Sequence, residues 1–558
     1  MSIAFSRQHL SRLRNNTDFT NLEELLQEYS QYQLKNIPLM KDYHDLLLSY
    51  CAFPFNKKIH SLATAELERI TGFLSNNTSK AKQTTLMGSG MAQTELICSY
   101  SRAITQWLVK TFPGSVELEG CEASNDDIIN VFHLLLPAVE FEVSTQRTLT
   151  LGSRIKLASG YQKPGDQLAW LMQVFEENQL DNHVKDQLFH QLKIFSRWRL
   201  DYQGFNKTLL RLPVQKIWYQ DNFIKPENSL RILQQKTGSP LPLSAGNKKF
   251  LLDLMRASLA FSYRETDPLT FADEDEIELF DLGRGLRIAL VGMEKRKRLS
   301  LESYIGYMAF KNGLPIAYGG GWLWGQRCKI GINIYPPFRR GESAWLFCQV
   351  LRIYYQYFGC RHFIVKPYQY GKGNPEGLKS GAFWFYYKLG FRPREHTIQQ
   401  EAAREWTKTR ANKKYRTGLN TLQRFTASNM EWKTSEQSFP RFDASVLSRV
   451  ISNSINKNYG RSRKKAIAAS LNKMKTILPL ENLRRQILFQ GRVIENWSLL
   501  TGLIDDIAQW TPGQKKKLLQ LVQLKQAGKE RDFIIQLQKH RRLWKSLQDI
   551  VETVKGGN

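Results

Sequence analysis

Cysteine and histidine are scarce in this chain. Six cysteines and nine histidines are spread over 558 residues. No two cysteines form a C-x-x-C pair, and no histidine lies at metal-ligand spacing from another. A zinc site needs such a cluster of ligands, so the sequence predicts no metal site. Isolated cysteines of this kind are mostly small core residues.

Long apolar runs are also missing. The longest, such as Val131 to Val139, fall well short of the roughly 20 residues that cross a bilayer. The opening MSIAFSRQHLSRLRNN contains no apolar stretch of the length that a secretory signal needs. The sequence therefore predicts a cytoplasmic protein with no membrane span.

Acidic residues are few relative to basic ones. The formal net charge is +29, and the sequence pI is about 9.7. From Glu401 to Asn558, 31 Lys and Arg residues stand against 13 Asp and Glu residues, so this part carries over half of the excess. Such an excess favours phosphate-rich partners, namely RNA, DNA, another polyanion such as anionic lipid, or coenzyme A.

Composition and periodicity divide the chain into three parts. Residues 1–248 are predicted to be mostly helical, in one or two subdomains, and end in a linker from Gln235 to Lys248 that is rich in Pro, Gly and Ser. Within this part, Thr148 to Ala158 alternates like a strand. It has no catalytic motif, which favours a helical scaffold or a partner-docking domain. Residues 401–558 are predicted to be basic and helical.

Residues 249–400 are predicted to form a mixed β-sheet with helices, which makes the fold class α+β. Lys311-Asn312-Gly313 is typical of a hairpin turn. A strand–helix–strand unit follows it and places its two strands parallel. The predicted elements are strands Ser303–Phe310, Leu314–Trp324, Cys328–Tyr335 and Arg361–Lys366, and helices Glu342–Phe358 and Leu378–Leu389.

The first segment that carries chemistry is the turn PPFRRGESA, from Pro336 to Ala344. Two prolines end a strand there, and a helix begins after them. The first turn of a helix has unpaired N–H groups and a partial positive charge, to which Arg339 and Arg340 add full charges. The turn therefore suits a pyrophosphate. The alternative is an ordinary basic turn between a strand and a helix.

The second segment, GAFWFYYKLGFRP, runs from Gly381 to Pro393. It resembles the second signature of the GNAT superfamily of N-acetyltransferases, which has Ala, then Phe-Tyr, a variable residue and Lys-Leu-Gly-Phe, often followed by Arg-Pro. The order of elements from Ser303 to Pro393, about 90 of the 558 residues, also resembles that family. The segment is similar to a bacterial group of such domains in which FR-G-ES and GAFWFYY-LGFRP runs recur.

This resemblance implies an N-acyltransferase that uses acetyl-CoA or another acyl-CoA and acts on an amine. The strands Cys328–Tyr335 and Arg361–Lys366 would part, and the pantetheine arm would lie in the gap. Tyr386 matches the family tyrosine that protonates the leaving thiolate, although it could instead be a core or interface aromatic. The implied cofactor-binding residues are Ile332 and Ile334 for the arm, and Arg339, Arg340, Gly341, Ser343 and Ala344 for the pyrophosphate.

The turn departs from the family pattern, which usually reads Arg/Gln-x-x-Gly-x-Gly/Ala. If Arg339 takes the first position, Ala344 matches the last, but Glu342 replaces the central glycine. One frame earlier, Gly341 is central and Phe338 takes the first position. A relative that does not bind coenzyme A is therefore an alternative.

The acceptor amine needs a general base, for which Glu302, Glu376 and His362 are candidates. Each of them could instead be a surface or structural residue. The loop Pro367–Lys379 is long and glycine-rich, and such loops beside a cleft often contact substrates. Its predicted substrate-binding residues are Tyr368, Gln369 and Asn374.

Aromatic residues are interspersed in the basic C-terminal part and could stack on nucleic-acid bases. The alternative is that they fill a core while the cations form solvated helix faces. The leading interpretation is an acyltransferase with substrate-recruiting flanks. The second is a non-catalytic GNAT-fold protein whose flanks bind nucleic acid or a protein, and the third is transfer of an amino acid or a long acyl group. The aromatic residues are Tyr415, Trp432, Trp497, Trp510 and Trp544.

Overall fold

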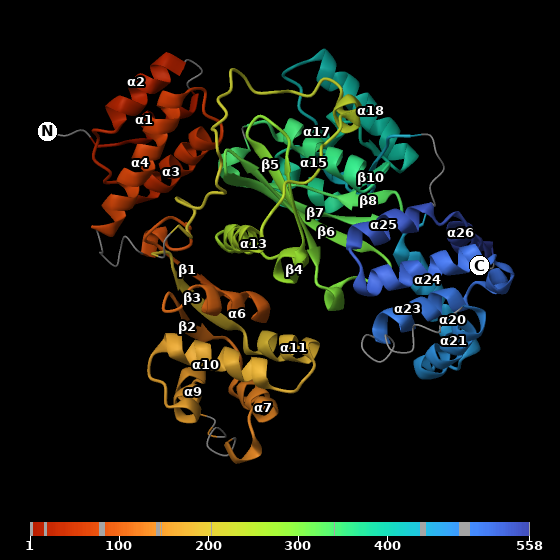
Figure 1. Cartoon of the computed structure of the whole chain (residues 1–558). Coiled ribbons are helices and arrows are strands. Elements are labelled where there is room, and N and C mark those ends of the chain that lie inside the picture. Colours follow the sequence, from red (N-terminus) through yellow and green to blue (C-terminus); the bar gives the residue numbers. More distant parts are fainter. Residues whose placement is uncertain are drawn as a thin grey trace.

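The structure is a computed structural model of the chain, shown in Figure 1. Helices in both flanking regions surround a mixed sheet. The predicted α+β fold with a mixed sheet and helical flanks is therefore confirmed. The structure describes residues 4–15, 19–76, 84–140, 146, 148–201, 204–339, 341–435, 442–478 and 491–556.

The N-terminal region is a helical layer whose inner faces are apolar. Asn36 and Asn56 begin α3 and α4, because each side chain accepts a hydrogen bond from an amide in the first turn of its helix. Phe53 follows α3, and α3 contacts the short helix η2 (Pro336–Phe338) of the central region. The described helices are α1 (Arg7–Asn15), α2 (Phe19–Tyr29), α3 (Ile37–Ala52) and α4 (Lys57–Ser75).

A small antiparallel sheet follows, with β3 between β1 and β2. Trp198 of β3 is fully buried and stacks on Phe261, with ring centroids 5.3 Å apart. The strands are β1 (Glu95–Cys98), β2 (Val116–Cys121) and β3 (Ile194–Arg199). The described helices around them are α6 (Arg102–Thr111), α7 (Asn125–Leu135), α9 (Leu151–Ser159), α10 (Pro164–Glu177) and α11 (Asn182–Leu192).

The strand predicted from Thr148 to Ala158 is wrong, because α9 occupies that segment. Its caps explain the difference. The side chain of Thr150 accepts a hydrogen bond from the Ser153 amide at 3.2 Å, which starts the helix. Gly160 then ends the helix with a left-handed φ of 78°.

The central sheet of the described residues has nine strands, ordered β11-β12-β10-β8-β7-β6-β5-β4, with β9 paired to β7 off that path. Only β8 and β10 pair in parallel among these strands, so the sheet is mixed. Asn312 and Gly313, with φ of 47° and 82°, form the predicted hairpin turn. The strands are β4 (Ala272–Asp281), β5 (Leu286–Met293), β6 (Ser303–Lys311), β7 (Leu314–Trp324), β8 (Arg327–Ile330), β9 (Asn333–Ile334), β10 (His362–Val365), β11 (Arg392–Pro393) and β12 (Met430–Lys433).

The two faces of this sheet belong to two hydrophobic cores. Ile288 and Leu290 join the core under α15, whereas Ala289 and Val291 join the core shared with α13 and the small sheet. This split follows from the alternation of side chains along β5. The helices of the region are α12 (Ser229–Gln234), α13 (Ala245–Ala260), α14 (Asp267–Thr270), η1 (Lys295–Lys297), α15 (Ser343–Tyr357), η3 (Pro367–Tyr370), α16 (Pro375–Lys379) and α17 (Ala382–Lys388).

Two predicted elements of the sheet region are each divided in the structure. The strand expected at Cys328–Tyr335 consists of β8 and β9, with Gly331 and Ile332 between them. The helix expected at Leu378–Leu389 consists of α16 and α17, because Gly381 adopts a left-handed φ of 67° between them. Both interruptions border the predicted acyl-CoA gap.

The C-terminal region is mostly helical, as predicted, although its strand β12 joins the central sheet. Thr511 forms a capping box with Gln514 at the start of α24. His540 lies between α25 and α26 and accepts a hydrogen bond from the Leu543 amide at 3.2 Å in the second of these helices. The described helices are α18 (His396–Ala411), α19 (Leu419–Phe425), α20 (Ala444–Asn458), α21 (Arg463–Ile477), α23 (Gly491–Gly502), η4 (Asp505–Gln509), α24 (Pro512–Ala527), α25 (Glu530–Lys539) and α26 (Arg541–Gly556).

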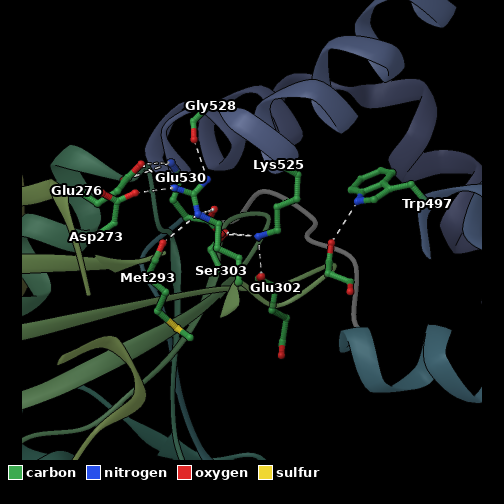
Figure 2. Close-up of polar contacts among 11 residues, drawn as sticks. Asp273, Glu276, Met293, Glu302, Ser303, Trp497, Lys525, Gly528 and Glu530 are labelled. Atoms are coloured by element: carbon green, nitrogen blue, oxygen red, sulfur yellow. Dashed lines mark hydrogen bonds and ion pairs between the residues drawn. The ribbon is translucent and has the colours of Figure 1, made fainter. Parts of the chain in front are cut away.

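A buried ionic cluster joins the C-terminal helices to the central sheet (Figure 2). Lys525 donates to the carbonyl of Glu302 at 2.9 Å and pairs with the carboxylate of Glu530. Arg298 donates to the carboxylate of Glu276 at 3.0 Å. The side chains of Lys525 and Glu530 are almost fully buried. The cluster therefore holds α24 and α25 against the start of β6.

Candidate functional site

The parallel strands β8 and β10 pair over a short stretch. In the described chain they pair at three positions, from Arg327 opposite His362 to Lys329 opposite Ile364. Beyond Ile330 the chain continues beside β7, which pairs with β9 in the same register, whereas β10 ends at Val365 and is followed by η3. Within the described residues the two strands are therefore paired over three positions only, and the predicted parting beyond them stays a prediction.

The side chain of Gln369 closes the space where the strands part. A Cβ built on Gly331 would lie 2.5 Å from Cδ of Gln369, so the amide of Gln369 packs directly on the Gly331 backbone. The hydroxyl of Tyr307 donates to the Gly331 carbonyl at 2.6 Å from the neighbouring strand β6. Gly331 is thus held in place by one tyrosine and covered by one glutamine.

Tyr386 lies at the same point of separation. Its side chain is 2% exposed, and its hydroxyl donates to Oε1 of Gln369 at 3.4 Å. Burial raises the pKa of Tyr386 well above its ordinary value, while a hydrogen bond with the backbone of Ile332 opposes that rise. The phenol is therefore neutral at physiological pH and holds a proton at the point where the strands part.

Glu342, the residue that breaks the family pattern of the turn, points into the core. Its carboxylate accepts a hydrogen bond from Lys311 at 3.0 Å and another from the Ile224 amide at 3.0 Å. Arg284 lies 3.4 Å away. Burial lowers the pKa of Lys311, and the nearby carboxylate opposes that change. The charge of Glu342 is therefore neutralised inside the protein and is not presented to a ligand at the turn.

The outer side of the turn is partly covered. A Cβ on Gly341 would lie 2.8 Å from the ring of Phe53, so the end of α3 packs on this glycine. Arg339 donates to the Ile334 carbonyl at 3.1 Å and pairs with Glu376. The hydroxyl of Ser343 donates to the Arg339 carbonyl at 3.1 Å. Arg340 lies outside the described residues.

Ser343 and Ala344 form the first turn of α15, and both remain half-buried. The amides of such a turn carry a partial positive charge. Together with Arg339, they are the part of the predicted pyrophosphate site that stays near the surface.

The structure does not bring the candidate bases Glu302 and His362 to Tyr386. Glu302 pairs with Lys329 at 2.7 Å, and Nε2 of His362 lies 3.0 Å from Glu431. Phe363, the neighbour of His362, is buried in the core under α15, so the imidazole points to the opposite face of the sheet. Glu376, the third candidate, is paired with Arg339 as described above.

The three predicted substrate-binding residues have different environments. Tyr368 is 58% exposed on η3, whereas its neighbour Gln369 points toward Gly331. Asn374 starts α16, because its side chain accepts a hydrogen bond from the Gly377 amide at 3.1 Å. It also donates to the Tyr368 carbonyl at 3.0 Å. Asn374 therefore fixes the loop that carries Tyr368 and Gln369.

A polar pocket beside η3 was not predicted from the sequence. Its cavity volume is about 450 Å³. Lys366 and Lys372 belong to one loop, but Arg394 and the segment Ala427–Asn429 lie further along the chain, so no local motif indicates the pocket. The lining residues are Lys366, Pro367, Tyr368, Lys372, Arg394, Glu395, Ala427, Ser428 and Asn429.

The aromatic residues of the C-terminal part do not form a stacking surface. Trp497 and Trp510 are buried, Trp432 and Trp544 are half-buried, and the hydroxyl of Tyr415 donates to Glu405 at 2.6 Å. These side chains serve the core, as the alternative interpretation expected. Within the described residues, no group of three or more His, Cys, Asp or Glu side chains is placed to hold a metal ion.

In the same described part of the chain, no helix is both long and apolar enough to cross a membrane. Comparison with models of known protein families, with curated proteins and with solved structures gave no match.

Proposed function

We propose that the central region is an acyl-CoA-dependent N-acyltransferase of the GNAT type, acting on an amine. The observation that carries this proposal is the short pairing of β8 with β10, which ends beside the buried, protonated hydroxyl of Tyr386. A thioester donor would supply an activated acyl group there. Tyr386 would hold the proton that the departing sulfur needs.

The described residues would accommodate such a donor once one side chain, that of Gln369, moves. Gln369 occupies the gap, so its side chain must turn away before a ligand can enter. The turn that carries it is followed by Gly371 and Gly373, whose φ values of 139° and 66° favour glycine and permit local movement. Glu342 is no obstacle, because Lys311 and Arg284 neutralise it.

Calorimetric titration of the full-length protein with acetyl-CoA tests this proposal. Saturable heat is expected, and the Gln369→Ala variant should bind more tightly, because it removes the side chain that fills the gap. Gln399→Ala on α18 is the matched control and should bind like the wild type. Absence of saturable heat from both the wild type and Gln369→Ala would overturn the proposal.

A second candidate function is binding of RNA through the basic C-terminal region. Between residues 404 and 416 the only acid is Glu405, which is buried and bonded to Lys408 and Tyr415. The cations of this stretch are all exposed, which gives a surface of positive charge. They are Arg404, Lys408, Arg410, Lys413, Lys414 and Arg416.

Fluorescence anisotropy with a labelled single-stranded RNA tests the second function. Affinity should fall steeply between about 50 and 200 mM salt, because binding releases counterions from the phosphates. Lys413→Glu/Lys414→Glu should weaken binding, whereas the exposed pair Lys156→Glu/Lys163→Glu, far away on α9 and before α10, should not. Equal losses of RNA affinity in the two double variants would count against a specific binding surface at Lys413 and Lys414.

A further inference from the structure

The polar pocket beside η3 carries an excess of positive charge. Lys366, Lys372 and Arg394 line it, and Glu395 is the one acid among its lining residues. All four side chains are exposed. Neither lysine has an ion-pair partner within the described residues, and Arg394 lies 3.8 Å from Glu431. The pocket therefore offers cations that no acid of the described chain fully neutralises.

The floor of the pocket is fixed by hydrogen bonds. The hydroxyl of Tyr370 donates to the Ser428 carbonyl. The Arg394 amide donates to the Asn429 carbonyl at 2.9 Å, and the Glu395 amide donates to the Ser428 hydroxyl at 3.0 Å. Two segments of the central region and one that follows it, with Ser428 and Asn429, therefore meet in a fixed arrangement, and the cations project from it.

The pocket and the gap between the strands share one short element. Tyr368 lines the pocket, and Gln369, the next residue of η3, fills the gap beside Tyr386. A molecule held by the pocket cations would therefore lie next to the mouth of the gap, where an acyl group would arrive. A volume of about 450 Å³ is within the usual range for small-molecule sites.

We propose that this pocket binds a small amine that carries a phosphate monoester, and that it presents this amine for acylation. Only the second part of this proposal, the presentation of the amine for acylation, rests on the proposed acyltransferase function. A phosphate monoester is favoured because it carries close to two negative charges above its second pKa of about 6, which matches the excess of cations. Charge-assisted hydrogen bonds from lysine and arginine are the strong contacts for such a group.

Calorimetric binding of three matched probes to the full-length protein at pH 8 tests the proposal. The probes are O-phosphoethanolamine, 2-aminoethyl hydrogen sulfate with a single negative charge on the ester, and ethanolamine with none. We expect saturable binding of the phosphate ester, at least tenfold weaker binding of the sulfate ester, and still weaker binding of ethanolamine. Equal affinities for the phosphate and sulfate esters, or no saturable binding of the phosphate ester, would overturn the proposal.

Variants locate the site. Lys366→Ala/Lys372→Ala should weaken binding of O-phosphoethanolamine at least tenfold, and both residues are exposed, so the fold should be retained. The matched control Lys156→Ala/Lys163→Ala also removes two exposed lysines and should bind like the wild type. If the pocket variant binds like the wild type, or if the control loses as much affinity, the pocket is not the site.

The same samples separate this inference from the proposed function. Acetyl-CoA is titrated into each protein, and its binding depends on the gap between the strands, not on the pocket lysines. Binding of the phosphate ester, with no binding of acetyl-CoA by either the wild type or Gln369→Ala, would support the pocket and refute the transferase. Binding of acetyl-CoA with no discrimination between the phosphate and sulfate esters would support the transferase and refute the pocket.

Discussion

Glu342 shows, at the scale of single residues, why a sequence pattern can mislead about charge. In the turn from Pro336 to Ala344 it suggests a negative charge beside a phosphate. Its partners Lys311 and Arg284 lie 31 and 58 residues earlier in the chain, so only the fold reveals that the charge is neutralised. The family pattern therefore fails at this position for a structural reason.

Glu342→Gln should lower the free energy of unfolding by about 3–5 kcal/mol, because it leaves Lys311 buried without its counter-charge. Urea denaturation measures the change. Glu376→Gln is the matched control, since the Arg339–Glu376 pair is exposed and should contribute less than about 1 kcal/mol. Similar losses in the two variants would contradict this account of Glu342.

Tyr386→Phe should lower the rate of acyl transfer by about 10²–10⁴-fold, because it removes the proton donor at the point where the strands part. The acetyl-CoA affinity should change little. Release of free thiol from acetyl-CoA in the presence of a mixture of amines measures the rate, and its pH profile should change as well. Tyr161→Phe, at a tyrosine 47% exposed on the surface, is the control. An unchanged rate in Tyr386→Phe would remove the hydroxyl from the mechanism.

At the scale of helices and strands, the elements with strong periodicity were predicted well. The hairpin at Asn312-Gly313, the helix α15 and the parallel pair β8–β10 follow from turn chemistry and from the strand–helix–strand order. The strands of the small sheet were missed, because they are only 4–6 residues long and lie between amphipathic helices. Such short runs carry little periodic signal.

The edge strand β4 was missed for a different reason. Its sequence ADEDEIELFD is acidic, and Glu274 and Asp275 in its first half are exposed to solvent. Charged residues on an edge strand discourage pairing with another chain, so an acidic run is compatible with a strand at that position. The pocket around Lys366 was predicted only in part, through Tyr368, because Arg394 and the segment Ala427–Asn429 reach the loop of Lys366 and Lys372 only in the fold.

His44 links helix α3 to a distant loop, and this contact should make stability depend on pH. Its Nε2 lies 2.9 Å from the Thr208 hydroxyl, and Asp45, which is paired with Lys207, lies 3.6 Å from Nδ1. Burial lowers the pKa of His44 below the ordinary value of about 6.5. The unfolded chain therefore takes up a proton below about pH 6.5 that the folded protein does not.

His44→Gln should remove this increment of pH dependence. The wild type should lose about 1 kcal/mol more stability than the variant between pH 7.5 and 5.5, because stability falls wherever the unfolded state binds more protons. Urea denaturation at the two pH values measures the difference. Parallel pH dependence in the two proteins would show that His44 does not contribute.

At the scale of the whole molecule, the ionic cluster of Figure 2 fastens the basic C-terminal region to the sheet. Lys525→Ala should lower the free energy of unfolding by about 3 kcal/mol, at the low end for a broken buried pair, because Arg298 still lies 3.3 Å from Glu530. It should also speed proteolytic cleavage between the sheet and α24. Lys529→Ala, at an exposed lysine of the same segment, is the control. Equal cleavage rates in the two variants would contradict a fastening role.

The two neighbouring residues of η3 have a consequence for the order of events in the protein. Since Tyr368 faces outward and Gln369 faces inward on one short turn, a rotation of that turn that withdraws the amide would also move the phenol. Two occupants on opposite sides of that turn are then thermodynamically coupled. By thermodynamic linkage, the factor by which one occupant changes the affinity of the other is the same in both directions. Titration with either occupant first should therefore give the same total free energy of binding.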